Sequence, residues 1–246
     1  MGDVSVTQGL LVALSALAAG TIGGVAGYGT GLLMPLVLAS VVDPALVVPI
    51  IGLSALFTNA SRILAFRHDV DWRKAFLITC TALPTCIIGA YGYTFLTGRG
   101  ASTIIGAALV LLVPARRALK RLRAQLTTRG TIIAGSGYGL LVGGTAGSGV
   151  VLLSILISTG LSGRAVVATD AAISLALSLV KTSTFQVAGA LPASAWAMAI
   201  LVGLAATPGA FIAKQLTKTL PVHIHDTILD GAVLVGGAIL LVKGLS

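Results

Sequence analysis

Charged residues are scarce in this sequence. They make up 9% of its 246 residues, whereas about 25% of the residues in an average soluble domain are charged. The seven acidic residues are all aspartates, so the chain lacks glutamate, a common general acid or base. Hydrophobic residues make up 56% of the chain, and so few charges cannot cover a soluble domain of this size. A soluble globular protein is therefore excluded.

Cysteine and histidine are also rare, which leaves little material for catalysis or metal binding. Cys80 and Cys86 lie six residues apart on one apolar segment, a spacing that separates them around a helix. We expect small core residues there, not a disulfide or a metal pair. The histidines fall in charged loops, and the HIHD stretch at 223–226 offers only two imidazoles. Because no metalloprotease, nucleophile-elbow or phosphate-transfer motif occurs, we expect no enzymatic activity, no cofactor and no metal.

Long uncharged stretches are what the sequence does contain. Each is longer than the roughly 20 residues that cross a ~30 Å hydrocarbon core; they are Leu10 to Val42, Ala75 to Gly98, Gly130 to Gly163 and Thr182 to Ala213. They predict an all-α polytopic membrane protein in contact with lipid, in the inner (plasma) membrane of a prokaryote. The first residues lack a basic region and a small-residue cleavage site. The first segment is therefore expected to be a retained helix and not a removed signal peptide.

The net charge of +9 comes largely from one short region. Six of the sixteen lysines and arginines lie in the run at 116–129, namely Arg116, Arg117, Lys120, Arg121, Arg123 and Arg129. A basic run beside a membrane span is typical of a cytoplasmic loop near anionic headgroups. We therefore place this linker in the cytoplasm and expect no nucleic-acid partner.

The two halves of the chain resemble each other. GGVAGYGTG at 23–31 returns as GGTAGSGVV at 143–151, shifted by 120 residues. Arg62 returns as Lys181 at a shift of 119 residues, and Pro84 returns as Pro208 at a shift of 124. The order of the matches is kept, which indicates an internal duplication. We assign residues 1–117 to the first repeat, 118–129 to the linker and 130–246 to the second repeat, all within one integral membrane domain.

Each repeat is predicted to contain one glycine-broken segment followed by three transmembrane helices. The broken segments are 8–40 and 130–160, and the helices are 44–66, 74–97 and 101–117, then 163–187, 194–214 and 224–243. A helix of 33 residues would be ~50 Å long, so a broken segment either crosses with an unwound middle or folds back as a re-entrant hairpin. Crossing segments would give parallel repeats and hairpins would give inverted ones. Hairpins place twelve cations on one side and two on the other, a cleaner split than ten to four, so we favour inverted repeats.

A broken helix at membrane depth needs a reason, and a binding site supplies one. Irregular backbone is tolerated there when it lines a cavity, and discontinuous helices often hold the substrate of a transporter. The second half-helix is expected to begin near Thr30 or Gly31 in one repeat and near Ser148 in the other. Its free N–H groups would attract an anion, and hydroxyl groups such as that of Thr145 would donate further hydrogen bonds. The alternative is that the glycines only allow close helix packing.

Two cations at matched places support an anion. Arg62 and Lys181 are costly in lipid unless they face a cavity or a partner, and together they could clamp one anion. Alternatively, Arg62 snorkels toward the loop at 67–74, and Lys181 forms an ion pair with Asp170. Asp170 itself is either a carboxylate that couples transport to H⁺ or Na⁺ or a counter-ion. The predicted substrate-binding residues are Gly27, Gly29, Thr30, Gly31, Asn59, Arg62, Gly147, Ser148, Gly149 and Lys181.

Aromatic residues accompany these features. Phe66 and Phe185 follow Arg62 and Lys181 by four residues, on the same helix face. We expect them to pack in the core more than to contact a substrate. Trp72 lies in the charged stretch at 67–72 and is expected to anchor the chain at the membrane interface.

The duplicated pattern resembles the TauE/SafE family of sulfite and organosulfonate exporters, also called the toluene sulfonate uptake permease family. The residues that carry the resemblance are GGVAGYGTGLLMPLVL at 23–38, FRHDVDWRKAF at 66–76, Pro84 with Gly89-Ala90, and Pro208-Gly209-Ala210. The resemblance covers nearly the whole chain. It implies transport of a sulfur-containing oxyanion such as sulfite, thiosulfate or an organosulfonate, coupled to an ion gradient.

The expected function is therefore a secondary transporter that works by alternating access around a site near the membrane midplane. An anion channel of the same fold, or a transporter of another small anion, remains the alternative.

Overall fold

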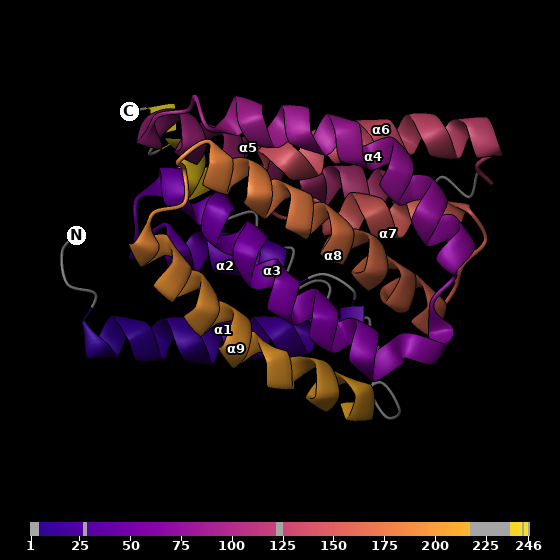
Figure 1. Cartoon of the computed structure of the whole chain (residues 1–246), viewed down its shortest axis with the longest axis horizontal. Coiled ribbons are helices and arrows are strands. Elements are labelled where there is room, and N and C mark those ends of the chain that lie inside the picture. Colours follow the sequence, from indigo (N-terminus) through magenta and orange to yellow (C-terminus); the bar gives the residue numbers. More distant parts are fainter. Residues whose placement is uncertain (1–4, 27–28, 122–124, 217–236, 243, 246) are drawn as a thin grey trace.

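The chain folds into helices that run along one another (Figure 1). The computed structural model describes residues 5–26, 29–121, 125–216, 237–242 and 244–245, and every regular element in these ranges is a helix. In chain order they are α1 (Val6–Ala26), α2 (Thr30–Leu38), α3 (Pro44–Phe66), η1 (Arg67–Asp69), α4 (Trp72–Tyr93), α5 (Gly98–Arg121), α6 (Thr128–Gly144), α7 (Gly149–Ser158), α8 (Arg164–Val187) and α9 (Ala193–Leu216). Among the described helices, α1, α3, α4, α8 and α9 are long and apolar enough to cross a membrane. The prediction of an all-α polytopic membrane protein is confirmed.

The predicted helices differ from these by a few residues only. The helix predicted at 44–66 has those bounds in the structure, and the one predicted at 163–187 begins one residue later. Both broken segments contain their interruption where the glycines cluster, after Ala26 and after Gly144. Most of the last predicted helix, 224–243, lies outside the described residues, although 237–242 is helical.

Local signals explain where several helices begin. Asp43 accepts a hydrogen bond from the backbone N–H of Ala45 (2.8 Å), and Pro44 occupies the first turn of α3, where a missing N–H costs nothing. Asp71 caps α4 by accepting from the N–H of Lys74 (3.1 Å). This bond holds the pKa of the Asp71 carboxyl below its ordinary value. Thr127 caps α6 in the same way through Gly130.

The chain reverses at both interruptions. Gly29 lies so close to α1 that a Cβ atom there would be 2.6 Å from the carbonyl oxygen of Ala19. In the second segment, the N–H of Leu126, just before α6, donates to the carbonyl of Ser158 at the end of α7 (2.8 Å). Both segments are hairpins with unequal arms. The first arm is longer than expected, since the 21 residues of α1 extend over about 31 Å.

Corresponding helices of the two halves run in opposite directions. In α3 and α8, Arg62 contacts Asp170 while Gly52 lies against the stem of Lys181, so the two helices are antiparallel. Figure 1 shows the turn between α3 and α4 at one end of the molecule and the turn between α8 and α9 at the other. This arrangement is the one that inverted repeats would produce, and inverted repeats stay our interpretation of it.

Glycine-rich contacts join helices of different halves. On α6, Gly135, Gly139 and Gly143 lie at successive turns against α4, and a Cβ atom at any of them would overlap α4. On α1, Gly20 and Gly24 lie in the same way against α9. Most glycines of these helices therefore serve close packing, which is a major source of helix association in membranes.

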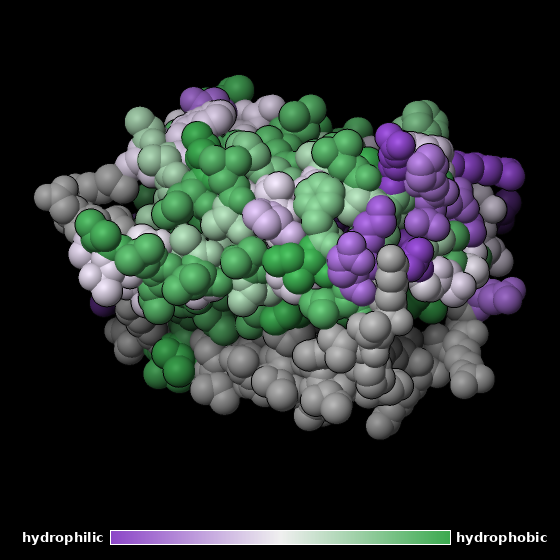
Figure 2. All heavy atoms as spheres, turned by 90° about the horizontal axis from the view of Figure 1, so that it is seen from below, coloured by the Kyte–Doolittle hydropathy of each residue, from purple (hydrophilic) through white to green (hydrophobic). Residues whose placement is uncertain are grey.

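The surface fits a lipid environment. Large apolar side chains cover the outer faces of the helices, among them Leu14, Phe76 and Leu204. Figure 2 shows a broad hydrophobic surface, with the hydrophilic side chains gathered toward the end where the α3–α4 turn lies. That turn contains Arg67 and is followed by Arg73 and Lys74. Trp72, which is 63% exposed, lies beside them.

The cysteines differ from the prediction that both lie in the core. Cys86 is buried, and its thiol approaches the carbonyl of Leu177 (3.9 Å). Cys80 is exposed on the outer face of α4. Because six residues leave two side chains about 120° apart around a helix axis, Cys80 and Cys86 face different surroundings. Phe66 and Phe185 are 3% and 0% exposed, which confirms that they pack in the core.

Candidate binding site

The two hairpin tips meet inside the molecule. A Cβ atom at Gly31, in the first turn of α2, would lie 3.3 Å from the backbone nitrogen of Gly147. The short helix α2 begins at Thr30 and α7 begins at Gly149, with Ser148 at its N-cap position, close to the expected starts. The first N–H groups of a helix have no partner within that helix, and they carry the positive end of its dipole. Two such ends therefore lie at one place.

A cavity of about 120 Å³ lies at this meeting point. A cavity needs roughly 10–15 Å³ to hold one water, so this one has room for a small solute. It is lined by all the described residues of the predicted site, namely Gly29, Thr30, Gly31, Asn59, Arg62, Gly147, Ser148, Gly149 and Lys181, together with Asp170. Gly27 lies outside the described residues.

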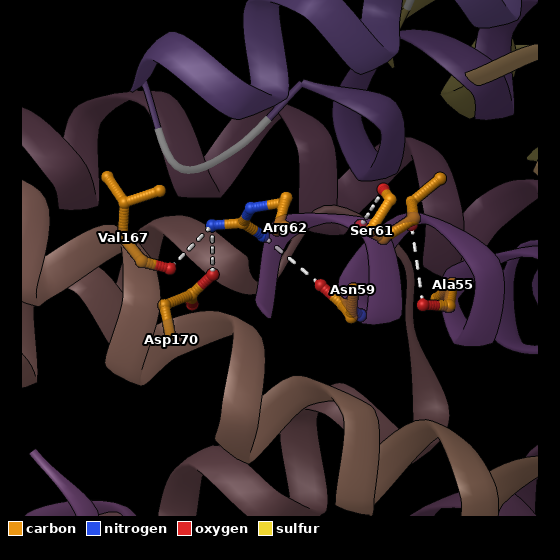
Figure 3. A network of polar contacts seen from close by, with 7 residues as sticks. Ala55, Asn59, Ser61, Arg62, Val167 and Asp170 are labelled. Carbon is orange, nitrogen blue, oxygen red and sulfur yellow. Dashed lines mark hydrogen bonds and ion pairs between the residues drawn. The ribbon is translucent and has the colours of Figure 1, made fainter. Parts of the chain in front are cut away.

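Arg62 turns into the cavity from α3 (Figure 3). Its guanidinium donates to Asp170 Oδ2 (2.8 Å), to Asn59 Oδ1 (3.1 Å) and to the carbonyl oxygen of Val167 (3.2 Å). The residue is only 8% exposed. The interpretation that Arg62 snorkels to the loop at 67–74 is therefore wrong. Inward orientation wins because α8 supplies a carboxylate and a carbonyl that compensate for desolvation.

Lys181 approaches the same cavity from α8 and caps a broken helix. Its ammonium group donates to the carbonyl oxygens of Val142 (2.6 Å) and Thr145 (2.9 Å), at the C-terminal end of α6. A cation is favourable there because the last carbonyls of a helix lack partners and carry negative charge. The proposed ion pair between Lys181 and Asp170 is wrong, since Asp170 pairs with Arg62. The ammonium also lies 5.8 Å above the centre of the Phe185 ring.

Among the described residues that line the cavity, Asp170 carries the carboxylate, and it is 1% exposed. Its Oδ2 atom binds Arg62, while its Oδ1 atom is buried and has no hydrogen-bond partner among the described residues. Of the lining side chains that the structure describes, two are cations and one is a carboxylate, which gives them a formal net charge of +1. The helix starts of α2 and α7 add further positive potential.

Several cavity residues were not predicted, among them Tyr138, Ser174 and Ser178. Two of them could have been found from helical spacing. Ser174 and Ser178 follow Asp170 by four and eight residues, and Lys181 comes three residues later, so all four lie on one face of α8. Tyr138 lies on α6 between packing glycines, and no pattern in its own segment points to it.

The family assignment agrees with this arrangement. The family model described as "Sulfite exporter TauE/SafE" matches residues 12–240. The chain belongs to the TauE/SafE family. Searches of curated proteins and of solved structures give no match. The resemblance found in the glycine clusters and the FRHDVDWRKAF stretch is confirmed, and TauE/SafE proteins are membrane transporters whose family name describes sulfite export.

The hairpin tip of this TauE/SafE protein provides a first prediction. Gly147 has a positive φ of +83°, and a Cβ atom there would lie 2.7 Å from Leu32 Cδ2. We expect Gly147→Ala to lose about 1–2 kcal/mol to backbone strain and about 1–3 kcal/mol more to overpacking between the tips, measured as thermal unfolding in detergent. Gly160→Ala is the matched control, because Gly160 has a φ of +88° and open space around it. Equal losses in the two variants would contradict close contact between the tips.

Proposed function

We propose that this protein is a secondary transporter that moves a small sulfur-containing oxyanion, namely sulfite, thiosulfate or an organosulfonate, across the membrane. The observation that carries the proposal is the convergence of two helix N-termini, Arg62 and Lys181 on one cavity. The N–H groups of the helix N-termini and of the two cations can donate hydrogen bonds to an anion. Their positive potential is strong in a low-dielectric interior. The family assignment supports the substrate class.

The cavity favours a compact substrate. Its volume of about 120 Å³ is several times the roughly 10–15 Å³ that a cavity needs to hold one water, so a small oxyanion such as sulfite, with its four non-hydrogen atoms, fits. Hydroxyl groups of Thr30, Ser148 and Ser174 surround the same space and add donors for oxyanion oxygens. A larger organosulfonate would need the cavity to widen as the protein opens to one side.

We infer an alternating-access mechanism with the cavity as its centre. The site would open first to one side of the membrane and then to the other, as in other transporters with discontinuous helices. Coupling to H⁺ or Na⁺ would drive net movement, and Asp170 is the proposed coupling carboxylate. Residues 1–117 and 130–246 would be the two inverted repeats.

The charge distribution supports an orientation in the membrane. One end of the molecule contains the start of α6 together with the basic residues Arg67, Arg73, Lys74 and Arg164. At the other end, Arg99 lies near Asp43 at the start of α3. By the positive-inside rule, the basic end and the linker at 116–129 would face the cytoplasm of a prokaryotic cell.

Counterflow in proteoliposomes tests the proposed function. We expect vesicles loaded with unlabelled thiosulfate to take up labelled thiosulfate transiently, with a rate that saturates as its concentration rises. Lys181→Ala should reduce this exchange at least tenfold, because loss of the ammonium leaves two carbonyls unpaired and removes one positive charge from the site. Lys214→Ala, which changes a lysine at the end of α9, is the control and should exchange normally.

The alternative of an anion channel makes the opposite prediction in this assay. With the membrane potential clamped at zero by valinomycin and equal potassium on both sides, a pore conducts without exchange, so its flux would not be stimulated by unlabelled thiosulfate inside the vesicle. Absence of any thiosulfate, sulfite or sulfonate flux would contradict both candidates.

A further inference from the structure

Asp170 occupies a position that an incoming oxyanion would need. Its carboxylate binds the Arg62 guanidinium at 2.8 Å inside the cavity that we propose for the substrate. A carboxylate and a sulfur oxyanion present the same kind of acceptor oxygen to a guanidinium. Because Arg62 also donates to Asn59 and to the carbonyl of Val167, few of its five N–H groups are available to a second acceptor. Substrate and Asp170 therefore compete for one donor group.

A second observation concerns the other oxygen of the same carboxylate. Oδ1 of Asp170 is buried and has no hydrogen-bond partner among the described residues. An ionised carboxylate without full hydrogen bonding is costly in a buried place, unless its cation stays beside it. If Arg62 turns to a substrate, the carboxylate loses the partner that stabilises its charge, and a proton on Oδ1 removes that charge.

We propose that Asp170 is an internal occupant of the anion site, and that an oxyanion which binds Arg62 displaces this carboxylate and is bound together with one proton. The inference rests on the proposed function. In the exchange, the Arg62–Asp170 ion pair breaks, an ion pair between Arg62 and the oxyanion forms, and a proton released by the acid form of the buffer forms an O–H bond on Asp170, which leaves the buffer in its base form. The charge of the lining side chains rises from +1 to +2, which matches a divalent anion such as thiosulfate.

The matched positions of the two halves differ in whether a carboxylate lies beside the cation. The shift of 119 residues that relates Arg62 to Lys181 relates Asp170 to Ile51, which has no charge. Lys181 accordingly binds two neutral carbonyl oxygens instead of a carboxylate. The proton site lies toward the basic end of the molecule, because the neighbouring Thr169 accepts a hydrogen bond from the N–H of Asp71 in the α3–α4 turn (3.0 Å).

Among the described residues, the other ionisable groups near Asp170 come from α3, α4, α6, α8 and the α3–α4 turn, where the N–H of Asp71 bonds to the neighbouring Thr169. Arg62 comes from α3, and Tyr138 comes from α6 and lines the same cavity. Lys181 lies on the same face of α8 as Asp170. From α4, Cys86 faces Leu177, two turns away along α8. The helix α7 has no ionisable side chain, and η1 contributes Arg67, His68 and Asp69 at the basic end.

Calorimetry with potassium thiosulfate tests the proposal on the full chain. Binding is measured between pH 6 and pH 8 in pairs of buffers that differ in their enthalpy of ionisation, which gives the number of protons bound with each anion. Thiosulfate is not itself protonated in this range. We expect about one proton per thiosulfate at the alkaline end, where the apparent Kd should rise about tenfold per pH unit.

Asp170→Asn is the decisive variant, because asparagine keeps the shape but neither competes as an anion nor takes up a proton. We expect its proton uptake to fall to zero, its Kd to become independent of pH, and its affinity at pH 8 to exceed that of the wild type at least tenfold. Asp43→Asn, at the exposed cap of α3, makes the same chemical change outside the cavity and should behave like the wild type.

The possible results separate the two proposals. Thiosulfate binding without proton uptake by the wild type would overturn the role of Asp170 and leave anion binding intact. Proton uptake that persists in Asp170→Asn would overturn it as well. Binding of neither thiosulfate, sulfite nor methanesulfonate at any pH would overturn the proposed function and, with it, the inference. The proton count of the wild type decides the matter even if the variant does not fold.

Discussion

Arg62→Ala is expected to abolish anion flux and to lower the free energy of unfolding by about 3–5 kcal/mol. The second effect arises because Asp170, 1% exposed, would remain buried without its cation, and removal of one partner of a buried ion pair costs this much. The first arises because the guanidinium is one of the two side-chain cations that the described part of the chain places at the cavity. Thiosulfate counterflow and thermal unfolding in detergent measure the two effects separately.

The double variant Arg62→Ala/Asp170→Ala distinguishes the two effects. It removes both charges, so stability should recover by several kcal/mol while flux stays absent. Arg67→Ala is the control, since Arg67 is exposed and lies just after α3, and it should change neither quantity by much. Normal flux in Arg62→Ala would contradict a substrate-binding role for this residue.

Gly139→Ala is expected to have the second large effect, on folding alone. A Cβ atom at Gly139 would overlap the carbonyl oxygen of Ala82 and the hydroxyl of Thr85. Neither backbone can yield without separating α4 from α6, and overpacking costs about 1–3 kcal/mol even where side chains can rearrange. We expect a loss of at least that size, seen as a lower unfolding temperature and as aggregation in size-exclusion chromatography.

A neighbouring glycine supplies the control for this substitution. Gly137 lies two residues away on the same helix and has open space around the position of a Cβ atom. Gly137→Ala therefore gains alanine's helix preference, about 1 kcal/mol at most, without a clash. Equal stability of the two variants would show that the glycines of α6 are not needed for contact with α4.

The sequence predicted the helices and brought out a group of residues that line the cavity, because both leave signals in composition and spacing. The uncharged stretches define the spans, and the repeated glycine clusters mark the interruptions that meet at Gly31 and Gly147. The duplication brought Arg62 and Lys181 to attention as a pair. Those features depend on local composition and on spacing, which a single sequence contains.

The partners of the cations could not be predicted with the same methods. Lys181 and Asp170 are eleven residues apart on one helix, so an ion pair between them was a reasonable alternative; the register between α3 and α8 instead places Arg62 opposite Asp170. That register depends on packing between distant segments. The same holds for Cys80, since sequence periodicity does not tell which side of α4 faces the lipid.

The contacts between α1 and α9 and between α4 and α6 determine how the two halves of the chain are joined. Each pair joins a helix from one half of the chain to a helix from the other, so the two halves of the sequence are interleaved in the fold. The described helices instead pack in mixed groups, one in which α1 and α3 contact α9 and another in which α6 and α8 contact α4. The two groups of helices contact each other where α3 packs against α8. The turns at 67–71 and 188–192 connect one group to the other. Residues 1–117 alone would lack the partners of α1 and α4, which are α9 and α6 in the second half. We expect the two halves to need each other in order to fold.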